Sequence, residues 1–148
     1  MQRKRIKTSL PLVGLSVLLA FGYCGDGSEE NAGNEANQTT PAVALTGTPA
    51  QNMITVMEMG VNALRNNSSN PGAAAAELNS LMASYDIADI RAQSRAARDA
   101  GQGATDAEKS RFQALLEEYK TLSTQVGAID PAAFNAAHSE WSRLWSIN

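Results

Sequence analysis

The sequence predicts an all-α fold, a four-helix up-down-up-down bundle that follows a signal peptide and a disordered linker. Three observations lead to this prediction. Apolar residues recur every three or four positions, turn-forming residues separate the periodic segments, and no segment after residue 50 alternates apolar and polar residues as a half-buried strand does. We therefore expect a signal peptide at residues 1–23, a linker at residues 24–50 and a helical domain at residues 51–148.

The clearest helical pattern lies at residues 105–129. Its large apolar residues follow one another at alternating steps of three and four positions: Phe112, Leu115, Tyr119, Leu122, Val126 and Ile129. Thr105 and Glu108 fit a capping box at the start of this helix. A helix with one narrow apolar seam cannot bury that seam alone, so other helices must cover it.

Two further helices are expected before this one. The first covers residues 51–66, and it ends where Asn, Ser, Pro and Gly cluster at residues 66–72. The second covers residues 73–99, with one face made of Ala74, Leu78, Leu81, Tyr85, Ala88 and Ala92. Asp86 followed by Asp89 also fits the start of a new helix, so a kink near Tyr85 is the alternative.

The last helix is expected from Asp130 to about Ser146, with Asp130 as its N-cap and Pro131 in its first turn. Trp141 and Trp145 lie on its apolar face, and the pattern leaves open whether they belong to the core or to an interface. Between residues 91 and 111 only alanines can face inward. We therefore expect the second and third helices to project from the bundle as a thin hairpin.

Composition limits the function classes. The chain has 148 residues and a net charge of −3, and residues 51–148 hold 8 basic and 11 acidic side chains. A domain without an overall positive field is not expected to bind nucleic acid. Cys24 is the one cysteine and precedes the helical region, which excludes a disulfide and a thiolate metal site in that region.

The N-terminus has the three parts of an export signal. Four of the residues at positions 3–7 are basic, the apolar run LPLVGLSVLLAF follows at residues 10–21, and Gly22, Tyr23 and Cys24 come next. An apolar run of 12 residues is short for a membrane span, which needs about 20. This part resembles the signal peptide of bacterial lipoproteins, in which a cysteine directly after the apolar run is lipidated and becomes the first residue. The resemblance implies lipidation of Cys24 and a membrane-anchored protein of the cell envelope.

Two alternatives remain for this segment. The residue before the cysteine is small in bacterial lipoproteins, whereas Tyr23 stands there in this chain. An ordinary secretory signal cut after Gly22 would release a periplasmic or secreted protein, and an uncleaved signal would act as the anchor. Residues 25–50 lack apolar periodicity and are expected to be a disordered spacer with a reach of roughly 25–30 Å.

His138 is the only histidine in the chain, and we expect it at the edge of the core beside Phe134 and Trp141. An alternative comes from a faint similarity to the small periplasmic b-type cytochromes, four-helix bundles that ligate haem through a Met in the first helix and a His in the last. This similarity implies His138 with Met57 or Met53 as axial ligands. In an up-down-up-down bundle Met57 and His138 would be level.

The expected hairpin carries the remaining candidate site. Arg91, Arg95 and Arg98 recur at steps of four and three on one helix face, and Lys109 and Arg111 lie on the facing helix. These five residues indicate a contact with an anionic partner such as an envelope protein, and a solvated charged face is the alternative. No nucleophile set, metal set or phosphate-binding glycine loop is recognised.

We therefore expect an exported, lipid-anchored helical protein that acts by binding or structural interaction. We expect no enzyme activity and no cofactor, with a haem-binding electron-transfer bundle as the alternative function.

Overall fold

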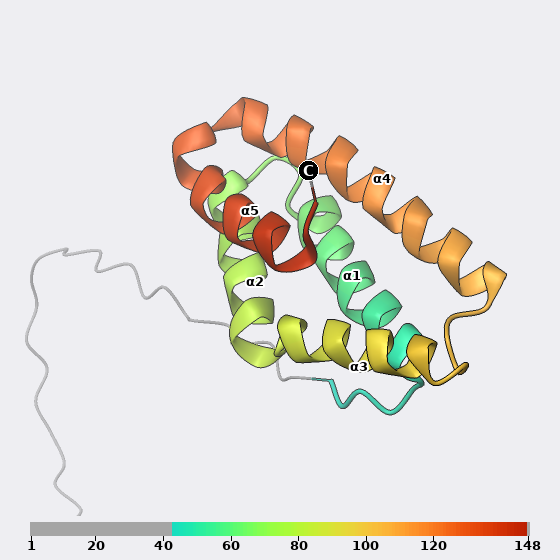
Figure 1. Ribbon diagram of the computed structural model, residues 1–148. Helices are drawn as coiled ribbons and strands as arrows, with labels where there is room; N and C mark the ends of the chain where they lie inside the picture. The colour runs from blue at the N-terminus through green and yellow to red at the C-terminus, as the bar shows by residue number, and fades with distance from the viewer. Residues whose placement is uncertain (1–42, 148) are drawn as a thin grey trace, which may run out of the picture. The chain divides into compact units, whose positions relative to one another are not determined.

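The computed structural model describes residues 43–147, and this part of the chain is all-helical, as predicted. Its five helices are α1 (Pro49–Asn66), α2 (Pro71–Ser84), α3 (Ile87–Asp99), α4 (Asp106–Ile129) and α5 (Pro131–Trp145), shown in Figure 1. No strand occurs within these residues. The predicted signal peptide, Cys24 and most of the predicted linker lie outside the described residues.

The folded part starts earlier than residue 51. Helix α1 begins at Pro49 because Thr48 and Gln51 form a capping box that the sequence prediction missed. Before it, the N–H of Val43 donates to the hydroxyl of Tyr85 (2.6 Å), and that hydroxyl donates back to the Val43 carbonyl (3.0 Å). Leu45 packs against the core. Residues 43–50, which were assigned to the linker, therefore belong to the fold.

The expected second helix is two helices. Helix α2 ends at Ser84, Tyr85 has an extended backbone, and Asp86 caps α3 by accepting a hydrogen bond from the N–H of Asp89 (2.9 Å). The alternative of a kink near Tyr85 is thus confirmed as a complete break. The break lets Ile87 and Ile90 turn inward, where both are buried.

The predicted seam of α4 and the start of α5 are confirmed. Leu115, Tyr119 and Val126 are buried, whereas Ile129 at the end of α4 is 56% exposed. Thr105 and Glu108 form the expected capping box. Asp130 ends α4 and caps α5 by accepting from the N–H of Ala133 (3.1 Å). The chain therefore reverses within one residue.

The order of the helices around the bundle differs from the prediction. Ion pairs join Glu58 to Arg111 and Arg65 to Glu118, so a step of seven residues along α1 matches a step of seven along α4. Helices α1 and α4 are therefore parallel neighbours, and α2 and α5 form the second parallel pair (Figure 1). In an up-down-up-down bundle of sequence neighbours, by contrast, the first helix would lie between the second and the fourth.

The hairpin prediction is wrong for the same reason. The end of α2 and the start of α4 lie at opposite corners of the bundle, and α3 carries the chain between them by packing across the ends of α1 and α5. A projecting hairpin of alanine contacts would bury little apolar surface. Crossing the end of the bundle instead buries Ile87 and Ile90.

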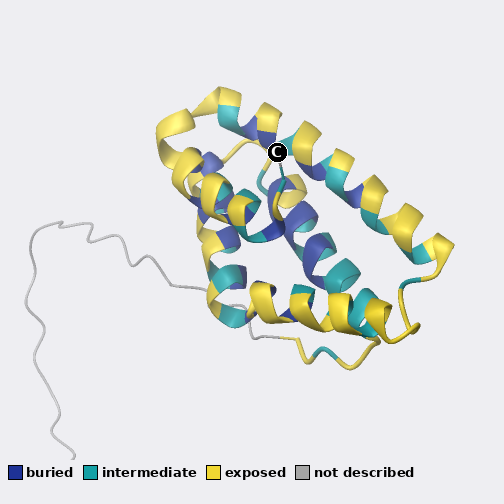
Figure 2. Cartoon of the chain, in the orientation of Figure 1, coloured by how far each residue is buried: buried dark blue, intermediate teal, exposed yellow. Residues whose placement is uncertain are grey.

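Helix α1 forms the centre of the molecule, with six buried residues, and Figure 2 shows it enclosed by the other helices. At its middle, the indole ring of Trp141 from α5 lies directly on Gly60. A Cβ atom at position 60 would overlap this ring, with Cη2 and Cε2 only 2.8 and 2.9 Å away. Both tryptophans of α5 are buried, which assigns them to the core.

We predict that Gly60→Ala lowers the free energy of unfolding by about 1–3 kcal/mol, because a rigid, fully buried indole must move to admit the methyl group. The matched control is Gly127→Ala in α4, where a Cβ would lie 3.5 Å from Phe134 in ordinary contact. The control should leave stability unchanged or raise it by up to about 1 kcal/mol. Urea unfolding of the full-length chain measures both, and equal stabilities of the two variants would contradict the prediction.

Candidate functional site

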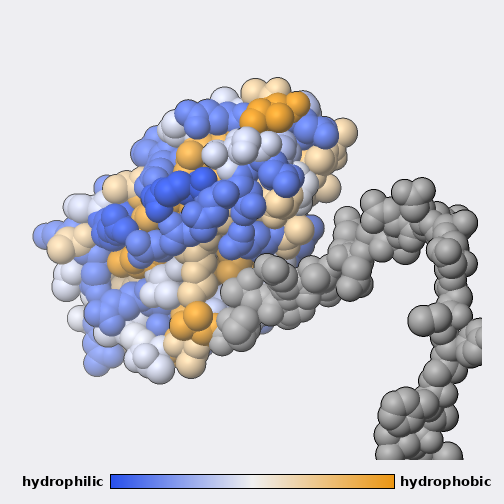
Figure 3. All heavy atoms as spheres, turned by 180° about the vertical axis from the view of Figure 1, so that it is seen from behind, coloured by the Kyte–Doolittle hydropathy of each residue, from blue (hydrophilic) through white to orange (hydrophobic). Residues whose placement is uncertain are grey.

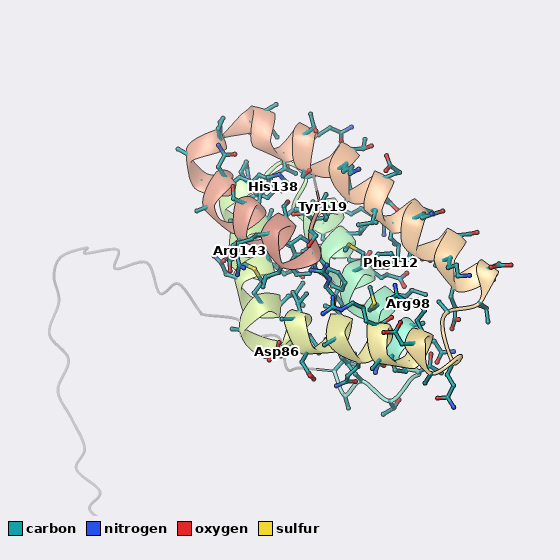
Figure 4. All side chains as sticks on the ribbon, in the orientation of Figure 1. Asp86, Arg98, Phe112, Tyr119, His138 and Arg143 are labelled. Carbon is teal, nitrogen blue, oxygen red and sulfur yellow. The ribbon has the colours of Figure 1, made fainter. Side chains whose placement is uncertain are left out.

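A cleft of about 440 Å³ opens where α3 meets the starts of α1 and α4. Its lining comprises Met53 from α1, Arg91, Ser94, Arg95 and Arg98 from α3, Gly103 and Ala104 from the connecting loop, and Lys109 from α4. Figure 4 shows Arg98 at this end of the molecule, near the end of α3. Four of the five basic residues singled out in the sequence therefore come together.

The charge of this cleft is opposite to that of the domain. It contains four of the eight basic side chains of residues 43–147, and no carboxylate of the described residues lines it. Four cations at one concave surface create a local positive potential within an acidic protein. The arrangement favours an anion at this position.

The four cations are not equivalent. Arg91 donates through a guanidinium nitrogen to the carbonyl of Leu144, so it ties α3 to the end of α5. Arg98 is paired with Asp99 (3.1 Å) and Lys109 with Asp106 (2.9 Å). Arg95 is exposed and makes no hydrogen bond or ion pair with the described residues. The cleft thus has one structural cation, two cations with carboxylate counter-ions and one, Arg95, without a partner in residues 43–147.

The loop between α3 and α4 forms one wall of the cleft. The N–H of Gln102 donates to the carbonyl of Ala97 (2.8 Å) and that of Gly101 to Arg98 (3.0 Å), which is a Schellman ending. This ending requires the positive φ of 75° found at Gly101. A Cβ at Gly103 would lie 3.3 Å from the Cα of Arg98, so this glycine lets the loop pack closely against the base of Arg98.

Arg111, the fifth predicted residue, is not part of the cleft. Its guanidinium donates to Glu58 (2.7 Å) and links α4 to α1. Sequence reasoning also missed Ser94, Gly103 and Ala104 as lining residues and assigned Met53 to a different site. These residues come together only because α1, α3 and α4 are adjacent in the folded structure. No local sequence motif predicts that adjacency.

His138 belongs to α5, and its side chain lies next to Tyr119 of α4 in a small polar cluster (Figure 4). Its Nδ1 is 3.0 Å from the hydroxyl of Tyr119 and 3.5 Å from that of Ser142, and its ring stacks on Phe134. Burial lowers the pKa of His138 from its ordinary value of 6.5. Burial also raises the pKa of Tyr119, so its hydroxyl stays protonated and can donate a hydrogen bond to Nδ1 of a neutral imidazole. The predicted place of His138 at the core edge is confirmed.

The proposed haem ligands do not converge. Trp141 contacts Gly60, which fixes the register of the antiparallel helices α5 and α1. Met57 lies three residues before Gly60, and His138 lies three residues before Trp141. Because the helices are antiparallel, these offsets add to about 9 Å along the axis. Met53 is one turn farther away and lines the cleft instead, so the geometry does not favour a His–Met haem site.

Metal-binding clusters and membrane-spanning helices are both absent from the described residues. No group of three His, Cys, Asp or Glu side chains in residues 43–147 is placed to hold a metal ion. Neither α1 nor α4, nor any shorter helix of this range, has the apolar length that a membrane crossing requires.

Comparisons with known proteins add no relative. No family model, no curated protein and no solved structure matches the chain. A function for this chain is therefore inferred from its sequence and from the geometry of the cleft.

We predict that acidification destabilises the protein through His138. Its pKa is lower in the folded than in the unfolded state, so its contribution to stability is complete above pH 6.5 and is lost as the pH falls toward the folded-state pKa. Urea midpoints measured from pH 7.5 to 5 for wild type and His138→Gln check this. The difference between the two should shrink as the pH falls, and a constant difference would contradict the assignment.

Proposed function

We propose that this chain is an exported protein of the bacterial envelope, anchored by a lipid on Cys24, whose helical domain binds an anionic partner in the cleft beside α3. The domain acts by binding, and we propose neither a catalytic activity nor a cofactor for it. The anchor and the binding site rest on independent observations.

The sequence of residues 1–24 supports the anchor. A basic patch, a 12-residue apolar run and an adjacent cysteine together resemble a lipoprotein signal. The folded part begins at or before Val43, so 18 residues separate it from Cys24. At no more than about 3.6 Å per residue, this segment can span up to about 65 Å.

One observation carries the binding proposal: half of the domain's basic side chains line a single cleft from which carboxylates of the described residues are absent. Arg98 and Lys109 each pair with a neighbouring carboxylate, as Lys120 and Arg143 do elsewhere, so local pairing alone does not distinguish the cleft. Here the cations converge, and Arg95 makes no pair with a described residue.

The rest of the surface supports a polar rather than an apolar contact. Among the described residues the exposed large hydrophobic side chains are Val43 and Ile129, which lie on separate elements. The face in Figure 3 is mostly hydrophilic with small separate hydrophobic spots. A broad apolar docking face is therefore not part of the proposal, and the overall acidic charge does not favour nucleic acid.

The lipid anchor predicts the mass of the mature protein. Protein isolated from bacterial membranes should begin at Cys24 and carry acyl chains, because the thiol of Cys24 is the predicted attachment site. Cys24→Ala should remove the added mass, because the variant lacks the thiol to which the acyl chains attach. An unmodified chain that begins at Tyr23 would instead identify an ordinary secreted protein.

The cleft predicts stabilisation by anions. Phosphate, pyrophosphate, sulfate and citrate are each compared with chloride at equal ionic strength, and at least one should raise the melting temperature, since a ligand of the native state stabilises it. Arg95→Gln with Lys109→Gln should abolish this increase.

The control for this experiment removes two charges elsewhere. Lys120→Gln with Arg143→Gln makes the same change in net charge on residues outside the cleft, each paired with a neighbouring glutamate. The control should keep the anion response. If both double variants lose it equally, the effect is one of net charge and the cleft is not the site.

A further inference from the structure

We infer that the cleft holds the phosphoryl group of a small, non-aromatic molecule, bound by Arg95, Arg98 and Lys109, with Asp99 and Asp106 as counter-ions that the ligand displaces. This inference rests on the proposed anion-binding function and names the chemical class of the ligand.

The charge available in the cleft suits a phosphoryl group. Arg91 is occupied by the carbonyl of Leu144, which leaves three cations for a ligand. A phosphate monoester carries about 1.5–2 negative charges and three acceptor oxygens on one centre, whereas a carboxylate carries one charge. One compact dianion can therefore contact several cations that a single carboxylate could not satisfy.

The residue types and their positions agree with this choice. Arg95 and Arg98 are three residues apart on one face of α3, and Lys109 approaches from the first turn of α4. Arginine presents a planar fork of donors that matches the oxygens of a phosphate, and lysine adds a point charge. Ser94 supplies a hydroxyl in the same lining.

The size and surroundings of the cleft indicate a small ligand rather than a membrane surface. A volume of about 440 Å³ lies within the range of roughly 300–1,000 Å³ that small-molecule sites occupy. Asp99 and Asp106 are exposed and pair with cleft cations, and they would repel a flat anionic lipid surface. No aromatic side chain lines the cleft among the described residues, so a nucleobase would find no stacking partner.

Two carboxylates beside the cleft offset part of its positive charge when no ligand is bound. The Arg98–Asp99 and Lys109–Asp106 pairs are exposed, with side-chain exposures of 69% for Asp99 and 99% for Asp106. Lys109 lowers the pKa of Asp106, which therefore stays charged. Such surface pairs contribute little to stability, and a bound phosphate can replace them at small cost.

Isothermal titration of the full-length protein in a non-ionic detergent tests the inference. Glycerol 3-phosphate and succinate are matched probes, because both are small, non-aromatic and carry about two negative charges at pH 7.5. We expect glycerol 3-phosphate to bind at least about fivefold more tightly than succinate at equal ionic strength. Arg95→Gln should weaken that binding by about tenfold or more, because a hydrogen bond to a charged group is lost.

A gain of affinity provides the second readout. Asp99→Asn removes the counter-ion of Arg98 and should tighten glycerol 3-phosphate binding about two- to threefold. Asp89→Asn makes the same charge change at a carboxylate that bonds to Gln93 (2.6 Å) instead of a cleft cation, and it should leave the affinity unchanged. Equal tightening by both variants would overturn the counter-ion role.

The remaining outcomes separate this inference from the proposed function. Succinate binding as tightly as glycerol 3-phosphate overturns the phosphoryl assignment but leaves an anion-binding cleft. A preference for phosphatidylglycerol over phosphatidylcholine vesicles that Arg95→Gln abolishes, without binding of glycerol 3-phosphate, overturns the small-molecule assignment in favour of a lipid surface. If neither these probes nor the anions of the melting experiment bind, both the inference and the anion-binding part of the proposed function fail.

Discussion

The contact between the indole of Trp141 and the backbone of Gly60 is the constraint on which the rest of the fold depends. It allows α5 to lie across from α1 and still fill the centre of the bundle, because a glycine leaves room for the ring against the helix backbone. Helices α2 and α4 then pack beside this pair, and Tyr119 stacks on Trp141 with ring centroids 6.1 Å apart. The same register places His138 next to Tyr119 and separates it from Met57, which is why the polar cluster forms and the two possible haem ligands do not meet.

The position of the cleft follows from the parallel pairing of α1 and α4. Because these helices are neighbours that run in the same direction, the chain must return across the end of the bundle between α2 and α4, and α3 makes this crossing. Ile87 and Ile90 of α3 are buried in the core. The three arginines of α3 therefore lie beside the starts of α1 and α4, where they line the cleft. An arginine series that would form a solvated stripe on a projecting hairpin becomes the wall of a concave site. The function proposed for those arginines therefore depends on tertiary structure.

Local signals in the sequence predicted where most of the helices begin and end, but not which helices pack against one another. The seam of α4, the cap at Thr105 and the Asp130–Pro131 reversal were all recognisable, because capping and helical periodicity act within a few residues. Periodicity shows which face of a helix is apolar, but not which helix will cover it, so the order around the bundle was wrong. Gly60 gave no signal, since its importance arises from a ring on another helix. Four of the five predicted basic residues share the cleft, whereas Arg111 pairs with Glu58 in a contact that only the α1–α4 pairing creates.

Tyr85 connects this architecture to the proposed anchor. Its extended backbone ends α2 and allows α3 to turn across the bundle, while its hydroxyl holds both backbone groups of Val43. A single residue thus sets the direction of α3 and the place at which the preceding chain joins the fold. That place lies at the end of the bundle crossed by α3 (Figure 1). The cleft is lined by residues of α3 and of the starts of α1 and α4, at the same end. If Cys24 carries a lipid, the segment from the anchor enters the domain at the end that carries the anion site. A ligand held there is then kept near the membrane, at a distance limited by that segment and by the length of α3, without any need for the domain itself to bind lipid.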